Sequence, residues 1–81
     1  MNKIEKLNFD YVPSLWDKRE SLFKENTVEL KDISSIDVSG MAILVKWAKA
    51  QKDQKLHLIN VPVSAMNLIN TYRLGQLFVL D

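Results

Sequence analysis

The sequence contains no cysteine, a single histidine and only two glycines among its 81 residues. Without thiols the chain forms neither disulfide bridges nor thiolate metal sites, and one imidazole cannot supply the histidines of a zinc centre. Neither Gly-x-x-x-x-Gly-Lys-Ser/Thr nor Gly-x-Gly-x-x-Gly occurs, so a glycine-rich loop that cradles phosphate is not supported. We therefore expect no metal, no cofactor and no enzymatic activity.

Surplus charge and long apolar runs are also lacking. The sequence has eleven Lys and Arg residues and ten Asp and Glu residues, which gives a net charge of +1. Because nucleic-acid-binding domains carry clustered positive charge, no nucleic-acid partner is expected. The longest apolar run, residues 41–45, is far shorter than the ~18 residues of a membrane-spanning helix, and no apolar signal segment opens the chain. These features predict a cytoplasmic protein without a membrane span.

The residues that are present indicate one α/β domain over residues 1–81, because the chain is too short for two cores. Alternating and helical periodicities divide the sequence into seven elements. Short strands are predicted at residues 3–8, 27–32, 56–59 and 77–80, and helices at 11–24 (with Asp10 as N-cap), 39–54 and 63–72. This alternation predicts a small, mostly parallel sheet of about four strands with about three helices.

The predicted helix at residues 39–54 is apolar around an arc of roughly 220°, wider than the stripe that one sheet face covers. Either the neighbouring helices cover both flanks of this arc, or one flank is a docking surface for another protein. The apolar surface that one sheet face would leave uncovered begins beside residues 37–40. These residues form a loop that follows the carboxyl end of a strand. Open α/β sheets place their binding sites at such positions.

Residues 28–42 resemble the strand, loop and helix start of STAS domains. In that family an apolar strand and a short linker lead into Asp-(Ser/Thr)-(Ser/Ala/Gly)-Gly-Leu, which corresponds here to Asp37-Val38-Ser39-Gly40-Met41. Residues 15–20 and 66–74 support the likeness, which extends over about residues 6–80. Within the family, the sequence is most similar to the small STAS subunits of Mla-type phospholipid ABC transporters, and more distantly to anti-sigma-factor antagonists.

The resemblance implies a STAS-like fold and a non-enzymatic subunit that binds and stabilises or regulates the ATPase subunit of an ABC transporter. Through that ATPase the chain would reach the membrane permease, at the periphery of the inner membrane. The expected partner-binding residues surround the start of the second helix: Asp37, Val38, Ser39, Gly40, Met41, Leu44 and Val45.

The sequence departs from the family pattern in two ways. The N-terminal edge strand or hairpin is reduced, because the chain begins near its end. The phosphorylatable hydroxyl of anti-sigma-factor antagonists corresponds to Val38, which cannot accept a phosphoryl group. This departure counts against an antagonist switch controlled by a serine kinase. The switch is the alternative function, and it would require the adjacent Ser39 as the phosphoryl acceptor.

Several of these residues also have purely structural interpretations. Ser39 is expected to cap the second helix, and Asp37 to shape the loop and contribute to the cap. Gly40 allows either the close approach of a partner backbone or a local conformation. His57 alternates with leucines in a strand, which is typical of a structural residue. Lysines recur every three residues at Lys46, Lys49, Lys52 and Lys55. This spacing is typical of a solvated face, and a contact with anionic lipid is a secondary interpretation.

Overall fold

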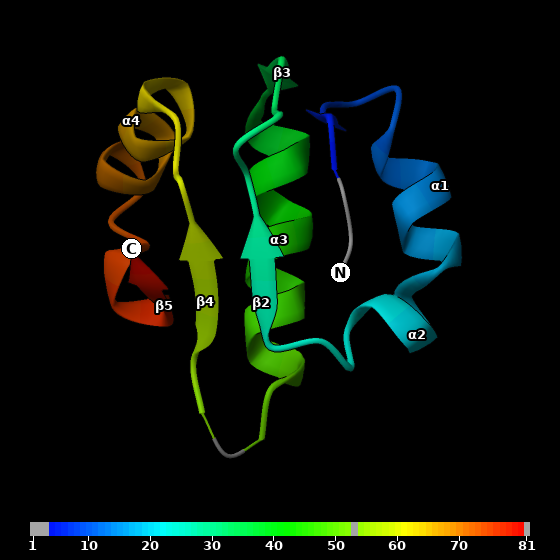
Figure 1. Cartoon of the computed structure of the whole chain (residues 1–81). Helices are drawn as coiled ribbons and strands as arrows, with labels where there is room; N and C mark the ends of the chain where they lie inside the picture. Colours follow the sequence, from blue (N-terminus) through cyan, green and yellow to red (C-terminus); the bar gives the residue numbers. More distant parts are fainter. Residues whose placement is uncertain (1–3, 53, 81) are drawn as a thin grey trace.

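The computed structural model describes residues 4–52 and 54–80 and has an α/β fold with two small parallel sheets (Figure 1). The larger sheet has the strand order β2-β4-β5 and the smaller pairs β1 with β3. The strands are β1 (Lys6–Leu7), β2 (Thr27–Glu29), β3 (Ser35–Ile36), β4 (Leu56–Ile59) and β5 (Phe78–Leu80). Every pairing is parallel, as the alternation of strands and helices predicts.

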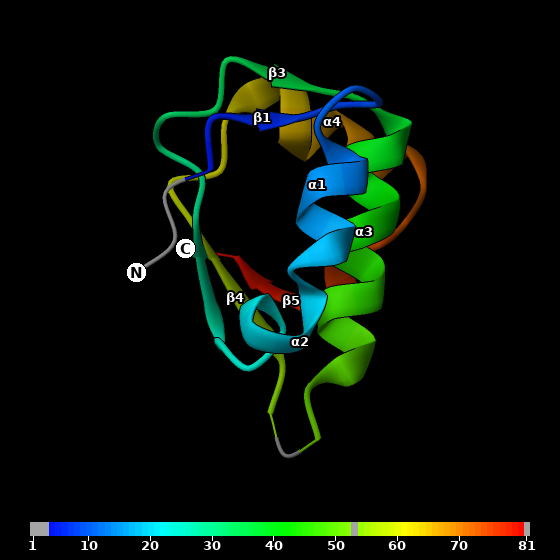
Figure 2. The same ribbon diagram turned by 90° about the vertical axis from the view of Figure 1, so that its right-hand side faces the viewer.

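The helices are α1 (Val12–Asp17), α2 (Arg19–Leu22), α3 (Val38–Ala50) and α4 (Val63–Thr71), and a short 3₁₀ helix, η1 (Gly75–Leu77), precedes β5. In Figure 1, α3 lies behind β2, and no helix of the described residues lies in front of β2 or β4. Figure 2 shows α1 alongside α3 on the same side of the sheet. The larger sheet therefore has one face covered by helices.

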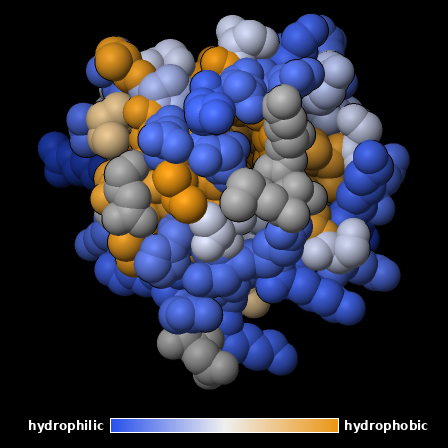
Figure 3. Space-filling model, in the orientation of Figure 1, coloured by the Kyte–Doolittle hydropathy of each residue, from blue (hydrophilic) through white to orange (hydrophobic). Residues whose placement is uncertain are grey.

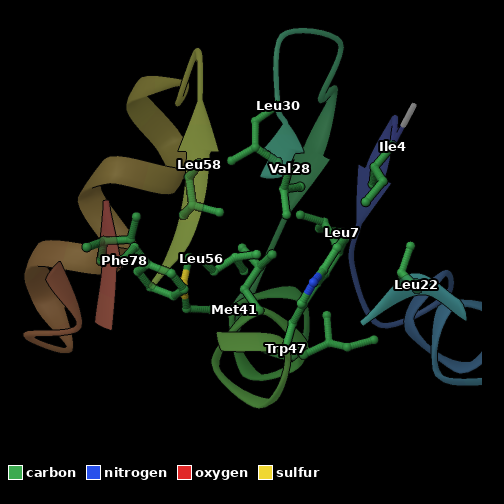
Figure 4. Close-up of a cluster of buried hydrophobic side chains, with 13 residues drawn as sticks. Ile4, Leu7, Leu22, Val28, Leu30, Met41, Trp47, Leu56, Leu58 and Phe78 are labelled. Atoms are coloured by element: carbon green, nitrogen blue, oxygen red, sulfur yellow. The ribbon is translucent and has the colours of Figure 1, made fainter. Parts of the chain in front are cut away.

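The core lies between the larger sheet and α3. Val28, Leu56 and Leu58 are fully buried, whereas the residues that alternate with them along the strands are half-buried. Figure 4 shows these strand side chains on the same side as Met41 and Trp47 of α3. Burying one such side chain stabilises the fold by about 1.5–3 kcal/mol, so each residue of this layer contributes to stability.

The predicted helix at residues 11–24 is divided at Lys18, which ends α1 and precedes α2. The bend turns α2 away from the axis of α1 (Figure 2) and brings Leu22 into the core. Asp10 is not the N-cap as predicted. That position belongs to Tyr11, and the side-chain Oδ1 of Asn8 accepts a hydrogen bond from the Tyr11 N–H at 3.1 Å.

The helix predicted at residues 39–54 starts one residue earlier, at Val38, and ends earlier, at Ala50. Gln51 has extended backbone angles, and its side-chain Nε2 donates to the carbonyl oxygens of Phe23 at 2.7 Å and Glu25 at 3.3 Å. These hydrogen bonds attach the end of α3 to the segment before β2. Lys3 and Asp53, which fall in the predicted strand 3–8 and helix 39–54, lie outside the described residues.

The strands are divided between two sheets rather than forming one. Residues 27–32 pair with β4 only as far as Glu29, and Ser35–Ile36 then forms a separate strand that the sequence pattern did not indicate. Two residues are too few to show a periodicity. The N-terminal strand is short, as expected, and its residues Lys6–Leu7 lie beside Ser35–Ile36 in parallel register.

Candidate docking surface

Asp37 joins the start of α3 to the N-terminal segment. Its side-chain Oδ1 accepts a hydrogen bond from the Gly40 N–H at 3.1 Å, and Oδ2 accepts one from the Phe9 N–H at 2.9 Å. The Asp37 N–H itself donates to the Leu7 carbonyl oxygen at 3.0 Å. The capping role predicted for Asp37 is confirmed. The prediction that Ser39 caps the helix is wrong, because Asp37 occupies the N-cap and Ser39 already lies within α3.

Gly40 is buried against the chain's own N-terminal strand. A Cβ atom at this position would overlap the carbonyl oxygen of Leu7 and lie 2.5 Å from its carbonyl carbon. Of the two roles predicted for this glycine, the structure therefore shows a close backbone approach, but within the chain. Gly40 is buried in this contact, and the half-buried Asp37 makes hydrogen bonds within the chain, so both residues have a structural role here.

Met41 and Leu44 also lie inside the protein. Their side chains are 2% and 0% exposed, so the expectation that they form an uncovered docking surface is wrong. The physical reason is the helical repeat, which places residues three apart on one face, and here that face packs on the sheet. Ile43 and Trp47 are buried as well, so the wide apolar arc is largely covered by the rest of the domain.

An apolar groove nevertheless remains on the outer surface of α3. Val38 is 52% exposed, Ala42 is exposed and Val45 is half-buried. Together with residues that follow α4 they border a cavity of about 290 Å³. This docking groove is lined by Val38, Met41, Ala42, Val45, Tyr72 and Leu74. Of the predicted partner-binding residues, Val38, Met41 and Val45 line the docking groove, Met41 as a buried side chain. Asp37 and Ser39 are half-buried and lie outside its lining.

The C-terminal end of α4 forms the second wall of the docking groove. Arg73 has a positive φ of 55°. Its N–H donates to the carbonyl of Asn70 at 3.2 Å, and the Leu74 N–H donates to that of Ile69 at 2.9 Å. This pair of hydrogen bonds is the Schellman motif that reverses a chain after a helix. The reversal places Leu74 beside α3, next to Tyr72, which is 51% exposed.

Sequence reasoning missed Tyr72, Leu74 and Ala42. The signal for Ala42 was its spacing of four residues from Val38, which places both on one helix face. Ala42 also borders a smaller cavity of about 180 Å³ on the other side of α3, where Ser39 lies near Val12. Ser39 therefore faces α1 and not the docking groove. In the sheet-side view of Figure 3, hydrophilic and hydrophobic residues are interspersed.

Titratable side chains also lie outside the docking groove. No group of three or more His, Asp and Glu side chains within residues 4–52 and 54–80 is arranged to hold a metal ion. His57 lies in β4, in register between Thr27 and Val79, away from the docking groove. The pKa of Glu29 is lowered, chiefly by hydrogen bonds from the side chain of Asn60.

Comparison of the chain with protein-family models, with curated proteins and with solved structures gives no match. Within the described part of the chain, no helix has both the length and the apolar character needed to cross a membrane. The accessible apolar groove beside the Asp37–Gly40 turn is thus the structural feature on which a functional conclusion depends.

Proposed function

We propose that this chain is a non-enzymatic, STAS-type subunit that binds the ATPase of a phospholipid-transport ABC complex through its docking groove. The exposure of Val38 beside an apolar groove carries this proposal. The similarity of Asp37-Val38-Ser39-Gly40 to STAS domains supports the choice of partner class. In this proposal the complex is of the Mla type, which maintains outer-membrane lipid asymmetry, and the chain acts in the cytoplasm at the periphery of the inner membrane.

The groove provides the elements of a small protein–protein contact. Val38 and Ala42 present apolar surface that loses water on binding, and Tyr72 supplies an aromatic side chain with a polar end at the rim. If the chain binds one conformation of the ATPase more tightly, it raises the population of that conformation in proportion to the difference in affinity. ATP hydrolysis then belongs to the partner, and the chain reaches the permease only through it.

Two exposed valines provide a matched test. Val38 is the first residue of α3 and Val63 the first residue of α4, and their side chains are 52% and 77% exposed. Aspartate at either position is compatible with a helix N-terminus. Only Val38 lines the docking groove. We expect the tagged chain, purified from its native host, to recover an ABC ATPase and its permease. Val38→Asp should abolish this recovery, and Val63→Asp should retain it.

The outcome contradicts the proposal if the unaltered chain recovers no ABC ATPase, or if Val38→Asp recovers as much as Val63→Asp. Circular dichroism of both variants establishes that each remains folded. Quantitative mass spectrometry of the co-purified chains then measures the loss directly.

A kinase-controlled anti-sigma-factor antagonist is the second candidate. Ser39 is half-buried at the cavity between α1 and α3, and Asp37 rather than Ser39 caps the helix. Its hydroxyl is thus not required for the cap. Incubation with a serine kinase from the same host and ATP, followed by measurement of intact mass, distinguishes the candidates. A stoichiometric phosphate on Ser39 favours the switch, and an unchanged mass favours the transporter subunit.

A further inference from the structure

A second groove lies on the other side of α3, between its C-terminal half and the α1–α2 segment, with a volume of about 650 Å³. Its floor is built from aromatic rings. Phe23 stacks on the buried Trp47 with ring centroids 5.7 Å apart, and Trp16 meets the Phe23 ring edge-on at 6.2 Å. Trp16 is 38% exposed, so this series of rings runs from the core to the surface.

The rim of this groove is positively charged. Its lining residues include four cations, Arg19, Lys24, Lys46 and Lys49, and one carboxylate, Glu20. The Arg19 guanidinium lies 4.4 Å from the centroid of the Trp16 ring. The Lys46 Nζ lies 5.7 Å from the same centroid. Since the net charge of the whole chain is only +1, positive charge is concentrated here and the remainder of the chain is net acidic.

The groove runs between the bent α1–α2 segment and α3. Trp16 lies in α1, Arg19 in α2 and Phe23 directly after α2, so the bent α1–α2 segment forms one wall. Lys46 and Lys49, three residues apart on one face of α3, form the other. Cations thus border an aromatic floor on both sides along the helix direction. An amphipathic helix laid between two such walls places its apolar face on the rings and its flanks beside the charges. Charge complementarity then requires those flanks to be acidic.

We propose that this basic groove, defined by Trp16, Arg19, Phe23, Lys46 and Lys49, binds an acidic amphipathic helical segment of a partner protein. A flat anionic bilayer would contact the exposed lysines and the exposed part of Trp16, but it would cover less of the half-buried Phe23 ring than a helix lying between the α1–α2 segment and α3. A free phosphate would use the cations but leave the aromatic floor uncovered. A helix with an apolar face and acidic flanks uses both parts of the groove along its length.

The proposal does not depend on the ABC transporter. The docking groove lies on the α4 side of α3, and the basic groove lies on the α1–α2 side. Each is tested by substitutions in residues that the other does not contain. Loss of binding in one groove therefore leaves the other proposal standing.

Three synthetic peptides of 16 residues, about four helical turns, test the basic groove. The first carries leucine on one helical face and glutamate on both flanks. The second replaces every glutamate by lysine, and the third keeps the glutamates but replaces every leucine by serine. We expect the first peptide alone to shift the amide resonances of the ¹⁵N-labelled chain around Trp16 and Lys46. Its affinity should fall about tenfold or more between about 50 and 500 mM salt, because ionic screening weakens the contact.

Charge reversal provides the matched control. In the double variant Lys46→Glu/Lys49→Glu we expect the affinity for the acidic peptide to fall at least tenfold. Lys31→Glu/Lys55→Glu changes the net charge equally at exposed residues that do not line the basic groove, and should bind as the unaltered chain does. Thermal unfolding of both double variants establishes that each is folded.

Four results would overturn the proposal. In the first, millimolar acidic peptide shifts no amide resonances around the basic groove. In the second, the lysine or serine peptide binds as tightly as the acidic peptide. In the third, the two double variants lose equal affinity for the acidic peptide. The fourth is binding of phosphatidylglycerol–phosphatidylcholine vesicles, but not of the acidic peptide, through Lys46 and Lys49. That result would assign the groove to a membrane surface.

Discussion

At the scale of single residues, the 37–40 turn works through its contacts with the N-terminal strand. Asp37 accepts hydrogen bonds from both Gly40 and Phe9, and Gly40 leaves room for the backbone of Leu7. The spacing of an aspartate three residues before a glycine therefore has a structural cause in this chain. The two residues between them are not needed for this role, and Val38 is exposed.

Gly40→Ala should destabilise the protein strongly, because its Cβ would overlap the Leu7 carbonyl and force β1 away from α3. We expect the free energy of unfolding to fall by about 3 kcal/mol or more, the upper end for overpacking. Gly75→Ala is the control, since a Cβ there meets only Ile69 Cγ2 at 3.9 Å, an ordinary contact. Urea unfolding measures both variants, and equal losses would contradict the close approach.

Asp37→Ala should cost about 1–2 kcal/mol of unfolding free energy, because it removes a helix cap together with the hydrogen bond to Phe9. Ser39→Ala should change the unfolding free energy by less than about 0.5 kcal/mol, because Ser39 does not cap the helix. Denaturant unfolding of the two variants side by side measures the difference. A larger loss for Ser39→Ala would restore the role predicted for it from the sequence.

At the scale of elements, periodicity predicted where the main helices and strands lie in the sequence, but not which elements pack against each other. The strand at residues 56–59 has the predicted bounds, because four alternating residues bounded by polar segments give a clear pattern. The apolar arc of α3 was also evident. The part of this arc that is covered is set by the packing of α3 against β2, β4 and α1. That packing involves contacts between residues far apart in the sequence, which periodicity does not predict. Met41 was consequently assigned to the surface, where it does not lie.

Two adjacent residues of α3 now test its orientation. Met41→Asp places a carboxylate where the native side chain is 2% exposed, and should reduce the unfolding free energy by more than about 4 kcal/mol. Ala42→Asp lies on the exposed face and should cost less than about 1 kcal/mol, the difference in helix propensity. Far-ultraviolet circular dichroism and thermal unfolding measure both. A folded Met41→Asp protein would show that this helix face is not buried.

At the scale of the whole molecule, the larger sheet, with β4 at its centre, and the smaller β1–β3 pair are joined through α3. The sequence predicted parallel strands and α/β architecture but not this division, since β3 is two residues long. At the ends of β2 and β4, Asn60 has a positive φ of 55° and its amide donates to Glu29 Oε1 and Oε2 at 3.2 and 3.0 Å. The Lys31 N–H also donates to Glu29 Oε2 at 3.0 Å. This cluster links neighbouring strands beyond their ladder.

The same cluster should make global stability depend on acid pH. The Asn60 amide, followed by weaker effects that include Lys31, lowers the pKa of Glu29 below its ordinary value of 4.5. The ionised carboxylate therefore contributes stability that is complete above the unfolded pKa and is lost as the pH falls through the folded pKa. Glu29→Gln should flatten the decline in unfolding free energy below about pH 4.5, measured by denaturant unfolding at a series of pH values.

Asn60→Gly keeps the positive φ accessible but removes the amide, so it should raise the pKa of Glu29 and flatten the same acid limb of the stability curve. If both variants retain the slope of the unaltered chain, the acid dependence arises from other carboxylates.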